Sequence, residues 1–424
     1  MKKAQRLITS VILLASFSVS YLQAESTPEP WKASKTEKYR LVWVNDPTTK
    51  AIVGWNQKEG SPGSVHYGEK DHGRDAEAYP MSKNTSEVNQ FDNFTNCFVN
   101  LDSLKPDSLY FFVIRDEFGT SRRFQFRTAP AKQQPFTFIA GGDSRNFRDV
   151  RIAANQLVAK LRPLFVAFTG DMVNQDTAQE WDEWLDDWQH TTSEDGRLTP
   201  IVAHRGNHER RPKTIPAYFH TPPLSFYSFN IGGNYFRYLA LNSEIPGGGK
   251  QKKWIESQFV QHADSSQYFV AGYHKPMRPH VSKKSEGTNP MNWANLFYEY
   301  GLDLALESDS HVMKRTLPLK PSAKGHEGFI AAPDDPNATV YIGEGCWGAP
   351  LRANDDNKPW TLASGSFNGF DWIHITPEQI EIRTVKIDSS SRVEPIRKDN
   401  SFKAPKGLHL WEPKSGAILT IKTD

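Results

Sequence analysis

The N-terminal part of the chain consists of short runs in which hydrophobic and polar residues alternate. Six such runs, separated by Asn, Asp, Gly and Pro, lie at residues 39–44, 51–55, 64–67, 97–101, 110–114 and 124–127. Alternation with a period of two is typical of strands that bury one face, and even spacing is typical of an antiparallel sandwich. We therefore predict an all-β sandwich domain over residues 36–130.

From residue 135 the pattern changes to continuous apolar runs that alternate with segments of helical periodicity. The apolar runs predict strands at residues 136–140, 164–168, 200–204, 236–241, 268–271 and 302–306. The periodic segments predict helices at 148–161, 177–189, 252–262 and 291–300. Asn146 is the expected N-cap of the first helix. Strands that alternate with helices predict a largely parallel sheet with helices on both faces.

After Thr316 the pattern becomes that of antiparallel strands. A strand is predicted at 339–342, and residues 372–375 and 380–383 are predicted to form a hairpin. We expect these strands to build a second sheet of the same domain, which then has two mixed sheets flanked by helices and spans residues 135–390. Residues 391–424 are expected to form a C-terminal extension.

The first residues have the pattern of an export signal. Three basic residues precede an apolar stretch at residues 7–19, and cleavage is expected after Ala24. Removal of residues 1–24 predicts an exported protein, periplasmic or secreted, without stable membrane insertion. The alternative is an uncleaved anchor, because Leu22 is larger than the residue usual at that position. The apolar stretch is, however, short for a membrane span of about 20 residues.

The net charge argues against nucleic acid as a partner. The whole chain has a formal charge of +2, and residues 1–24 contain Lys2, Lys3 and Arg6 but no acidic residue. The remainder therefore carries +2 − 3, or −1, and has no long basic run. Nucleic acids and anionic membranes are poor partners for such a surface.

Cys97 and Cys346 are the only cysteines of the sequence. In an exported protein they could form a disulfide between the two domains. Two single cysteines this far apart in the sequence are more often independent buried thiols, so both alternatives stay open at this point.

Five polar blocks follow predicted strands and carry most of the functional information. In chain order they are Gly141-Gly142-Asp143-Ser144-Arg145, Thr169-Gly170-Asp171, Gly206-Asn207-His208-Glu209, Tyr273-His274 and Ser308-Asp309-Ser310-His311. Ligands of open α/β sheets bind at the carboxyl edge of the strands, so these blocks can converge there. Carboxylates, an amide and imidazoles suit a pair of metal cations, which activate water against a phosphate.

Single residues in these blocks suit particular roles. Asp143 and Asp171 each follow a glycine at a strand end, where a carboxylate can point into a cleft. Adjacent Asn207 and His208 project in different directions, which suits one to bind metal and the other to protonate a leaving group. His274 taken alone would by default be a buried core histidine, and only its place among the other blocks makes it a candidate ligand.

The last block places Asp309 and His311 two residues apart. In an extended segment, side chains with this spacing reach the same face. Both are therefore candidate ligands of one metal centre.

The blocks resemble those of the calcineurin-like metallophosphoesterases. In the N-terminal domain, Leu104-Lys105-Pro106 followed by Tyr110, and the closing segment 126–130, resemble a fibronectin type III domain. The two together resemble a purple acid phosphatase. This resemblance implies a fibronectin III-like all-β sandwich followed by an α/β metallophosphoesterase domain.

The resemblance also implies a ligand set for two divalent or trivalent metal ions, of iron, manganese, magnesium or zinc. A bridging hydroxide would attack phosphorus, and His208 would donate a proton to the leaving group. The implied ligands are Asp143, Asp171 and His311 for the first metal, and Asp171, Asn207, His274 and Asp309 for the second.

Three positions depart from the family pattern. Asn174 stands at the metal-site position where purple enzymes have a tyrosine ligand, which predicts a colourless protein. Arg145 stands where many relatives without that tyrosine have a histidine, and Asp309 replaces an imidazole. The added positive and negative charges offset each other, and a carboxylate ligand favours harder cations such as manganese, magnesium or iron over zinc.

Arg145 is expected to bind the substrate phosphate through two N–H groups. Alternatively, it forms an ion pair with a ligand carboxylate and orients it. His280 lies six residues after His274 and is a candidate for a second phosphate contact. Otherwise it is a solvated loop residue.

The sequence thus predicts an exported metal-dependent phosphatase that hydrolyses small phosphate monoesters. One alternative is a phosphodiesterase that uses the same site. Another is a surface binding protein whose altered cleft no longer turns over substrate.

Overall fold

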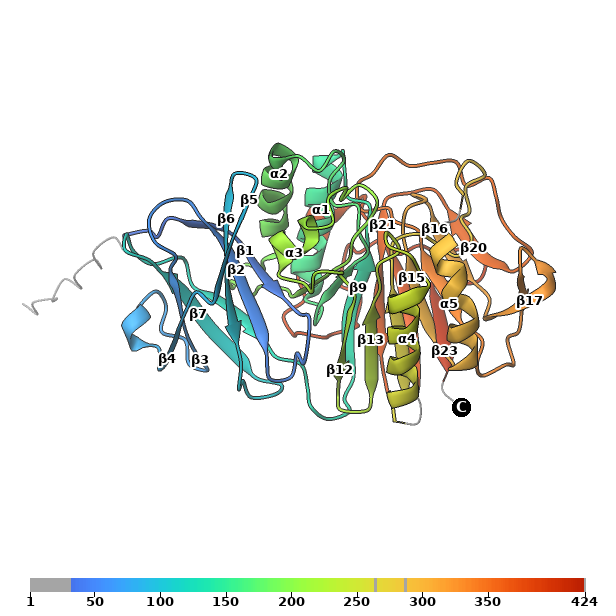
Figure 1. Ribbon diagram of the computed structural model, residues 1–424, viewed down its shortest axis with the longest axis horizontal. Helices are drawn as coiled ribbons and strands as arrows, with labels where there is room; N and C mark the ends of the chain where they lie inside the picture. The colour runs from blue at the N-terminus through green and yellow to red at the C-terminus, as the bar shows by residue number, and fades with distance from the viewer. Residues whose placement is uncertain (1–31, 263–264, 286–287, 423–424) are drawn as a thin grey trace, which may run out of the picture. The chain divides into compact units, whose positions relative to one another are not determined.

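The N-terminal strands form two antiparallel sheets that pack against each other (Figure 1). One face consists of β1 (Thr36–Val42), β2 (Ala51–Gln57), β6 (Phe94–Leu101) and β5 (Glu87–Phe91). The other consists of β4 (Met81–Asn84), β3 (Ser64–Gly68), β7 (Leu109–Arg115) and β8 (Phe124–Arg127). Val53 and Val99 pack with Phe112 in the buried core between them. The predicted all-β sandwich is confirmed.

Two strands of this sandwich, β4 and β5, are missing from the sequence prediction. Each lies at the edge of its sheet, and none of their residues is buried. An edge strand that buries neither face has no hydrophobic alternation, so the pattern does not reveal it. A short 3-10 helix, η1 (Ala76–Ala78), precedes β4.

The sandwich is continuous with the sheet that follows it. Val42 of β1 pairs in parallel with Ile201 of β11 (Ile201–Ala203). Trp43, directly after β1, is buried in the next core, with its ring 5.8 Å from that of Phe165. The buried Lys38 also forms an ion pair of 2.7 Å with Asp186. One sheet of ten strands therefore runs through both parts of the chain.

The second part of the chain contributes six strands to this sheet and seven to another. The six are β9 (Phe136–Gly141), β10 (Val166–Phe168), β11, β21 (Gly369–Ile375), β22 (Gln379–Lys386) and β23 (Ile418–Lys422). The seven are β12 (Tyr227–Ile231), β13 (Phe236–Ala240), β14 (Tyr268–Gly272), β15 (Leu304–Glu307), β19 (Val340–Gly343), β16 (Met313–Thr316) and β20 (Thr361–Gly365). Parallel strands lie at the centre of both sheets.

These two sheets and their helices form four layers. Phe138 and Ala167 of the first sheet pack against Val270 of the second in the core between the sheets. Alternate residues of the first sheet, such as Ile139, pack against α1 (Arg148–Leu161), α2 (Ala178–Trp188) and α3 (Thr214–Phe219). Alternate residues of the second, such as Phe269, pack against α4 (Gly249–His262) and α5 (Thr288–Glu299). The predicted two mixed sheets flanked by helices are confirmed.

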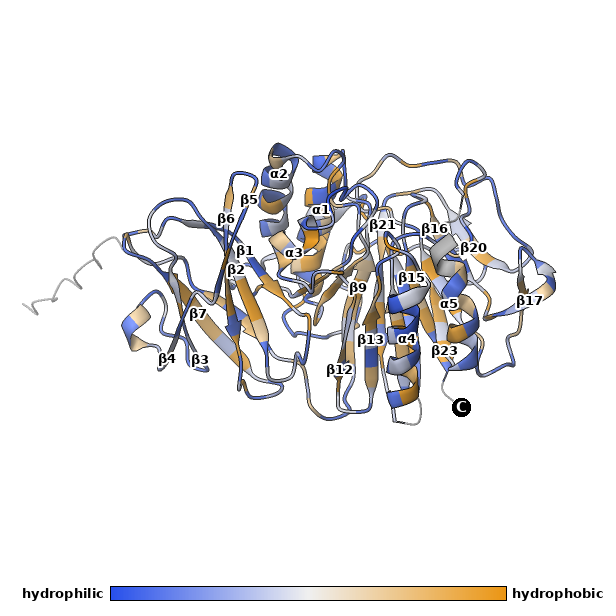
Figure 2. Ribbon diagram, viewed as in Figure 1, coloured by the Kyte–Doolittle hydropathy of each residue, from blue (hydrophilic) through white to orange (hydrophobic). Residues whose placement is uncertain are grey.

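The hydropathy of the chain follows this layering. Figure 2 shows hydrophobic residues concentrated in the strands and on parts of the helices, while most connecting loops are hydrophilic. A small sheet of β17 (Leu319–His326) and β18 (Phe329–Ala331) is separate from the two main sheets. Two further 3-10 helices are η2 (Gln189–Thr191) and η3 (Ser390–Arg392).

Several local predictions are wrong. The hairpin of β21 and β22 pairs with β9 in the first sheet, not with a separate antiparallel sheet. The strand predicted at 339–342 is β19, which lies in the second sheet as expected, but it pairs in parallel with β15 as well as antiparallel with β16. The N-cap of α1 is Phe147 without a side-chain hydrogen bond, whereas Asn146 has a left-handed backbone with φ of 78°. In the expected C-terminal extension, β23 pairs with β22 and extends the first sheet.

The structure is a computed structural model that describes residues 32–422 apart from 263–264 and 286–287. The predicted export signal at residues 1–24 lies outside the described residues. No helix in the described part of the chain is long and apolar enough to cross a membrane.

Both cysteines are free and buried. Cys97 lies in the core of the N-terminal sandwich, and Cys346 packs beside Met313 and Trp411. The prediction of two independent thiols is confirmed, and the disulfide alternative is wrong.

Candidate metal centre

The five polar blocks follow the carboxyl ends of five parallel strands. Asp143 follows β9, Asp171 follows β10, and Asn207 follows β11. In the other sheet, His274 follows β14 and Asp309 follows β15. Because β9, β10 and β11 run parallel to one another, as do β14 and β15, each group of side chains lies at one edge of its sheet. The two edges meet where His274 Nε2 lies 3.3 Å from Asp171 Oδ1.

Four of the predicted ligands have a left-handed backbone, with φ of 57° at Asp143, 55° at Asp171, 73° at Asp309 and 58° at His311. This conformation is uncommon outside glycine and persists only where surrounding contacts hold it. Main-chain hydrogen bonds provide such contacts. The N–H of Asp143 donates to the Gly170 carbonyl at 2.9 Å, and the N–H of Asp309 donates to Asp143 Oδ2 at 2.8 Å. The backbone therefore aims these side chains before any ligand binds.

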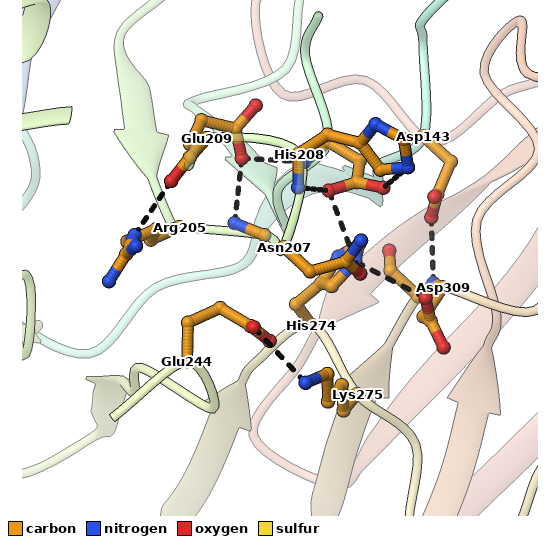
Figure 3. Close-up of polar contacts among 12 residues, drawn as sticks. Asp143, Arg205, Asn207, His208, Glu209, Glu244, His274, Lys275 and Asp309 are labelled. Atoms are coloured by element: carbon orange, nitrogen blue, oxygen red, sulfur yellow. Dashed lines mark hydrogen bonds and ion pairs between the residues drawn. The ribbon is translucent and has the colours of Figure 1, made fainter. Parts of the chain in front are cut away.

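His274 lies at the centre of one group of oxygens (Figure 3). Its Nε2 is 3.1 Å from Asn207 Oδ1, 3.3 Å from Asp171 Oδ1 and 3.7 Å from Asp309 Oδ1. Its Nδ1 donates to the Thr169 carbonyl at 2.9 Å, which leaves the Nε2 lone pair directed at these oxygens in the neutral ring. These are the four residues that the family resemblance implies for the second metal.

A second pair of ligand atoms lies beside this group. His311 Nε2 is 3.1 Å from Asp143 Oδ1, and His311 Nδ1 donates to the Pro350 carbonyl at 2.7 Å. With that proton on Nδ1, a neutral ring presents its other lone pair to a carboxylate oxygen. Two acceptor atoms this close are stabilised when a cation binds both, as the first metal of the family would.

The donor geometry fits metal ions. Ligand atoms that neighbour each other around an octahedral cation with bonds of 2.0–2.1 Å are about 3 Å apart, close to the distances found here. Asp143, Asp171 and His274 offer ligand atoms that all lie within 4.8 Å of one another, and all three are buried. Among the described residues, no donor hydrogen-bonds Asp143 Oδ1 or Asp171 Oδ2, although both atoms are buried. Buried oxygens without donors are what bound cations would satisfy.

The charges of the cluster also favour a cation. Burial lowers the pKa of His274, but the carboxylates of Asp171 and Asp143 outweigh burial and raise it well above its usual value. Burial raises the pKa of Asp171, but His274 outweighs it, so that carboxyl stays ionised far below its usual range. The same field that stabilises a proton on His274 Nε2 would stabilise a metal cation in that place.

Arg145 faces the cluster. Its Nε is 3.6 Å from Asp171 Oδ2, and one terminal nitrogen donates to His311 Nε2 at 3.3 Å. The other terminal nitrogen donates to Asn174 Oδ1 at 2.9 Å. Asn174 therefore contacts Arg145 at the position where purple enzymes have tyrosine. The guanidinium is close enough both to orient Asp171 and to meet a phosphate bound at the cluster.

His208 lies at the open side of the cluster (Figure 3). Its side chain is 21% exposed, and its Nε2 is 3.7 Å from Asp171 Oδ2. Its Nδ1 donates to the Asn174 carbonyl at 2.6 Å, and its main-chain N–H donates to Asp171 Oδ1 at 2.8 Å. Nε2 is therefore the ring nitrogen available to a substrate.

Glu209 holds the segment around these residues without joining the cluster. Its two oxygens accept N–H groups from Asp171 at 3.0 Å, Met172 at 2.7 Å and Gly206 at 2.7 Å. These bonds favour the carboxylate, but burial first and then the charge of Asp171 act against it and raise the pKa of Glu209 to about 8. In either form its oxygens bond to backbone, so Glu209 is a positioning residue.

His280 is buried and does not lie in a solvated loop. Its Nε2 lies 2.7 Å from Thr361 Oγ1, and its Nδ1 lies 3.3 Å from Glu344 Oε1. Glu344 also forms an ion pair of 2.7 Å with buried Lys314, which together with His280 outweighs burial and lowers the pKa of Glu344 to about 2. The hydrogen bonds of the His280 ring therefore go to this network and not to a predicted metal ligand.

Three residues at the cluster escaped the sequence analysis. Lys284 Nζ is 2.5 Å from Asp309 Oδ1, and Arg352 donates to the Asp309 carbonyl at 2.7 Å. Gly345 lies against Asp143 and has a left-handed φ of 77°. The two cations lie in irregular segments, where no periodicity points to them. Gly345 lies in the glycine-rich segment 343–350, where no periodicity points to it either.

Two family models match the sequence at the places where the structure changes architecture. The model "Purple acid Phosphatase, N-terminal domain" matches residues 36–128, which cover the strands of the β-sandwich. The model "Calcineurin-like phosphoesterase" matches residues 136–313, which contain all five polar blocks. The chain has a purple acid phosphatase N-terminal domain followed by a calcineurin-like phosphoesterase domain. Its fold is therefore that of a metallophosphoesterase, a family that implies a dimetal centre, and the Asp143, Asp171 and His274 cluster is the candidate for it.

Solved structures share this two-part fold at low sequence identity. Purple acid phosphatase PPD1 from yellow lupin (Lupinus luteus) seeds superposes with a TM-score of 0.69 at 15% identity, over 92% of this chain and 74% of the lupin chain. PhoD superposes with a TM-score of 0.63 at 10% identity, over 93% of this chain and 94% of PhoD. At these identities the similarity establishes the fold.

A curated relative comes from Mycobacterium tuberculosis. This uncharacterized protein is 23% identical over 339 residues, which cover 66% of this chain and 62% of the mycobacterial protein. The chain thus spans less than two thirds of the length of the relative.

Gly345 offers a test of how tightly the cluster is built. A Cβ at this position would lie 1.7 Å from Asp143 Oδ2, so we expect Gly345→Ala to displace the carboxylate and to lower bound metal markedly. Plasma mass spectrometry of purified protein measures the metal content. Gly73→Ala is the matched control, because Gly73 also has a positive φ, 60°, but nothing lies within 4 Å of its added Cβ. Both variants carry a backbone strain of about 1–3 kcal/mol, so equal metal content in the two would contradict the prediction.

Proposed function

We propose that this metallophosphoesterase is an exported phosphatase that hydrolyses small phosphate monoesters. The observation that supports it best is the cluster of strand-end ligands around His274 Nε2, which includes Asp171 and lies beside Asp143. Asp143 Oδ1 and Asp171 Oδ2 are buried and accept no hydrogen bond within the described part of the chain. Two cations bound there would lower the pKa of a water molecule and polarise the phosphoryl oxygens. Iron, manganese or magnesium suits the carboxylate-rich ligand set better than zinc.

Individual residues would bind the metal ions, hold the phosphate and protonate the leaving group. Asp171 lies between both ligand groups, and Glu209 and the His208 N–H fix its position. Arg145 is close enough to hold a phosphoryl oxygen while it keeps its contact with Asn174. His208 Nε2, with its proton supplied from solvent, would donate to the leaving alcohol.

The positive charge around the cluster supports a monoester as substrate. Arg145, Lys284 and Arg352 all contact residues of the cluster. A phosphate monoester brings up to two negative charges and a diester only one, so cationic side chains favour the monoester. A diester is the second choice at the same site.

Asn207 tests the metal centre directly. We expect Asn207→Ala to lose metal and to lower kcat by more than the 10–100-fold typical of outer-shell residues, because the amide oxygen lies 3.1 Å from His274 Nε2. Nitrophenyl phosphate hydrolysis and metal analysis provide the measurements. Asn84→Ala, at an exposed position in the sandwich, is the control. If the folded wild-type protein, after incubation with metal ions, contains no metal and shows no turnover, a surface binding protein without catalytic activity becomes the better explanation.

His208 tests the proton donor. Because an alkyl alcohol is a poor leaving group, we expect His208→Ala to lower kcat for glycerol phosphate by about 10²–10⁴-fold. Nitrophenyl phosphate needs less protonation and should lose far less. His326→Ala, an exposed histidine in β17, serves as control. An equal loss of kcat on both substrates would show that His208 does not donate the proton to the leaving group.

Export is the part of the proposal supported only by the sequence of residues 1–24. Expression of the full chain in a bacterial host with an intact export system should yield a processed protein. N-terminal sequencing should then find Glu25 as the first residue. An unprocessed protein that stays with the membrane fraction would support the anchor instead.

A further inference from the structure

Lys284 contacts the metal-binding cluster more closely than any other cation described in the structure. Its Nζ is 2.5 Å from Asp309 Oδ1. The same oxygen lies 3.7 Å from His274 Nε2, on the side where the second cation would bind. The ammonium group and that cation would therefore share one ligand oxygen.

The other two cations of the cluster act differently. Arg145 Nε is 3.6 Å from Asp171 Oδ2 and makes no hydrogen bond to it. Arg352 donates to the main-chain carbonyl of Asp309 and not to its carboxylate. Lys284 is thus the cation that binds a ligand oxygen directly.

The chain around Lys284 is fixed by hydrogen bonds. Its N–H donates to the Val281 carbonyl at 2.9 Å, which closes a turn. In that turn, the N–H and the hydroxyl of Ser282 donate to the Asp355 carboxylate at 2.8 and 2.9 Å. The Lys284 side chain is 22% exposed, so it reaches the cluster from a defined position at its rim.

We propose that Lys284 competes with the second metal ion for Asp309 and so makes the second position the weaker of the two. Asp309 adds a negative charge to a cluster that already contains two buried carboxylates, and the ammonium group offsets it. A cation at the second position has to take Asp309 Oδ1 from an ammonium group 2.5 Å away, whereas the competing contact at the first position is the longer, 3.3 Å hydrogen bond of Arg145 to His311 Nε2. The two positions then fill at different metal concentrations.

This proposal rests on the proposed function, because it assumes that the cluster binds two cations. Its test is a calorimetric titration of the metal-stripped full chain with Mn²⁺. We compare the wild-type protein with Lys284→Met and with Lys283→Met, which removes a neighbouring exposed lysine of the same segment. Lys284→Arg keeps the positive charge and reports on charge separately from shape.

We expect two Mn²⁺ sites in the wild-type protein and about a tenfold lower Kd of the weaker site in Lys284→Met, as removal of one nearby charge predicts. The Kd of the tighter site should stay unchanged, and Lys283→Met should match the wild type. Lys284→Arg should keep the weak site weak. Circular dichroism of the metal-stripped variants verifies that each is folded.

Two results would overturn the proposal. An unchanged Kd in Lys284→Met would show that the ammonium group does not compete, and a higher Kd would show that it orients Asp309 for the metal. Both differ from failure of the proposed function, in which no variant, nor the wild-type protein, binds Mn²⁺ at all.

Discussion

The structure has to accommodate three buried carboxylates in one cluster. Asp143, Asp171 and Asp309 are 0%, 1% and 4% exposed. Removing such groups from water costs several kcal/mol each unless opposite charge compensates them. Arg145, Lys284 and the His274 ring supply part of this compensation, and metal ions would supply the rest. The cluster therefore favours the binding of cations, because the fold brings negative charges close together.

The fold imposes this arrangement through its backbone. Strands of two different sheets end at the same place, and four of the six candidate ligands have a left-handed backbone that directs the side chain into the cluster. Asp143 and Asp171 come from neighbouring strands of one sheet, whereas Asp309 comes from the other. The packing of the two sheets therefore sets the distance between the two parts of the cluster, and the Phe138 and Phe165 rings, stacked 4.8 Å apart, belong to the core that fixes it. A rigid core between the sheets therefore keeps the candidate metal ligands of the two sheets at a fixed distance from each other.

The sequence alone predicts the parts of the molecule that have a local signal. Buried strands followed by glycine and a polar ligand are visible in the pattern, and all six ligands implied by the resemblance lie in one region of the structure. The edge strands β4 and β5 bury no side chain and leave no pattern. The sequence also does not predict which strands pair, because no residue pattern in the hairpin of β21 and β22 indicates that β9 is its neighbour.

The contacts of individual side chains also cannot be predicted from the sequence. His280 has the spacing of a site residue, but Glu344 and Thr361 bind both of its ring nitrogens. Lys284 has no motif around it and yet contacts a ligand carboxylate. Such contacts depend on how distant segments pack, which periodicity and spacing do not describe.

The pairing of β1 with β11 has a consequence for how this protein can be divided. β11 leads directly to Asn207 and His208, and β1 covers its otherwise open edge. Trp43, from the N-terminal domain, lies in the core between the two main sheets. A fragment that starts at residue 135 would lose this ring and present an unpaired strand to other chains, which favours aggregation. The sandwich is thus a structural part of the phosphoesterase domain, because it covers the edge of one sheet and completes the core between the sheets.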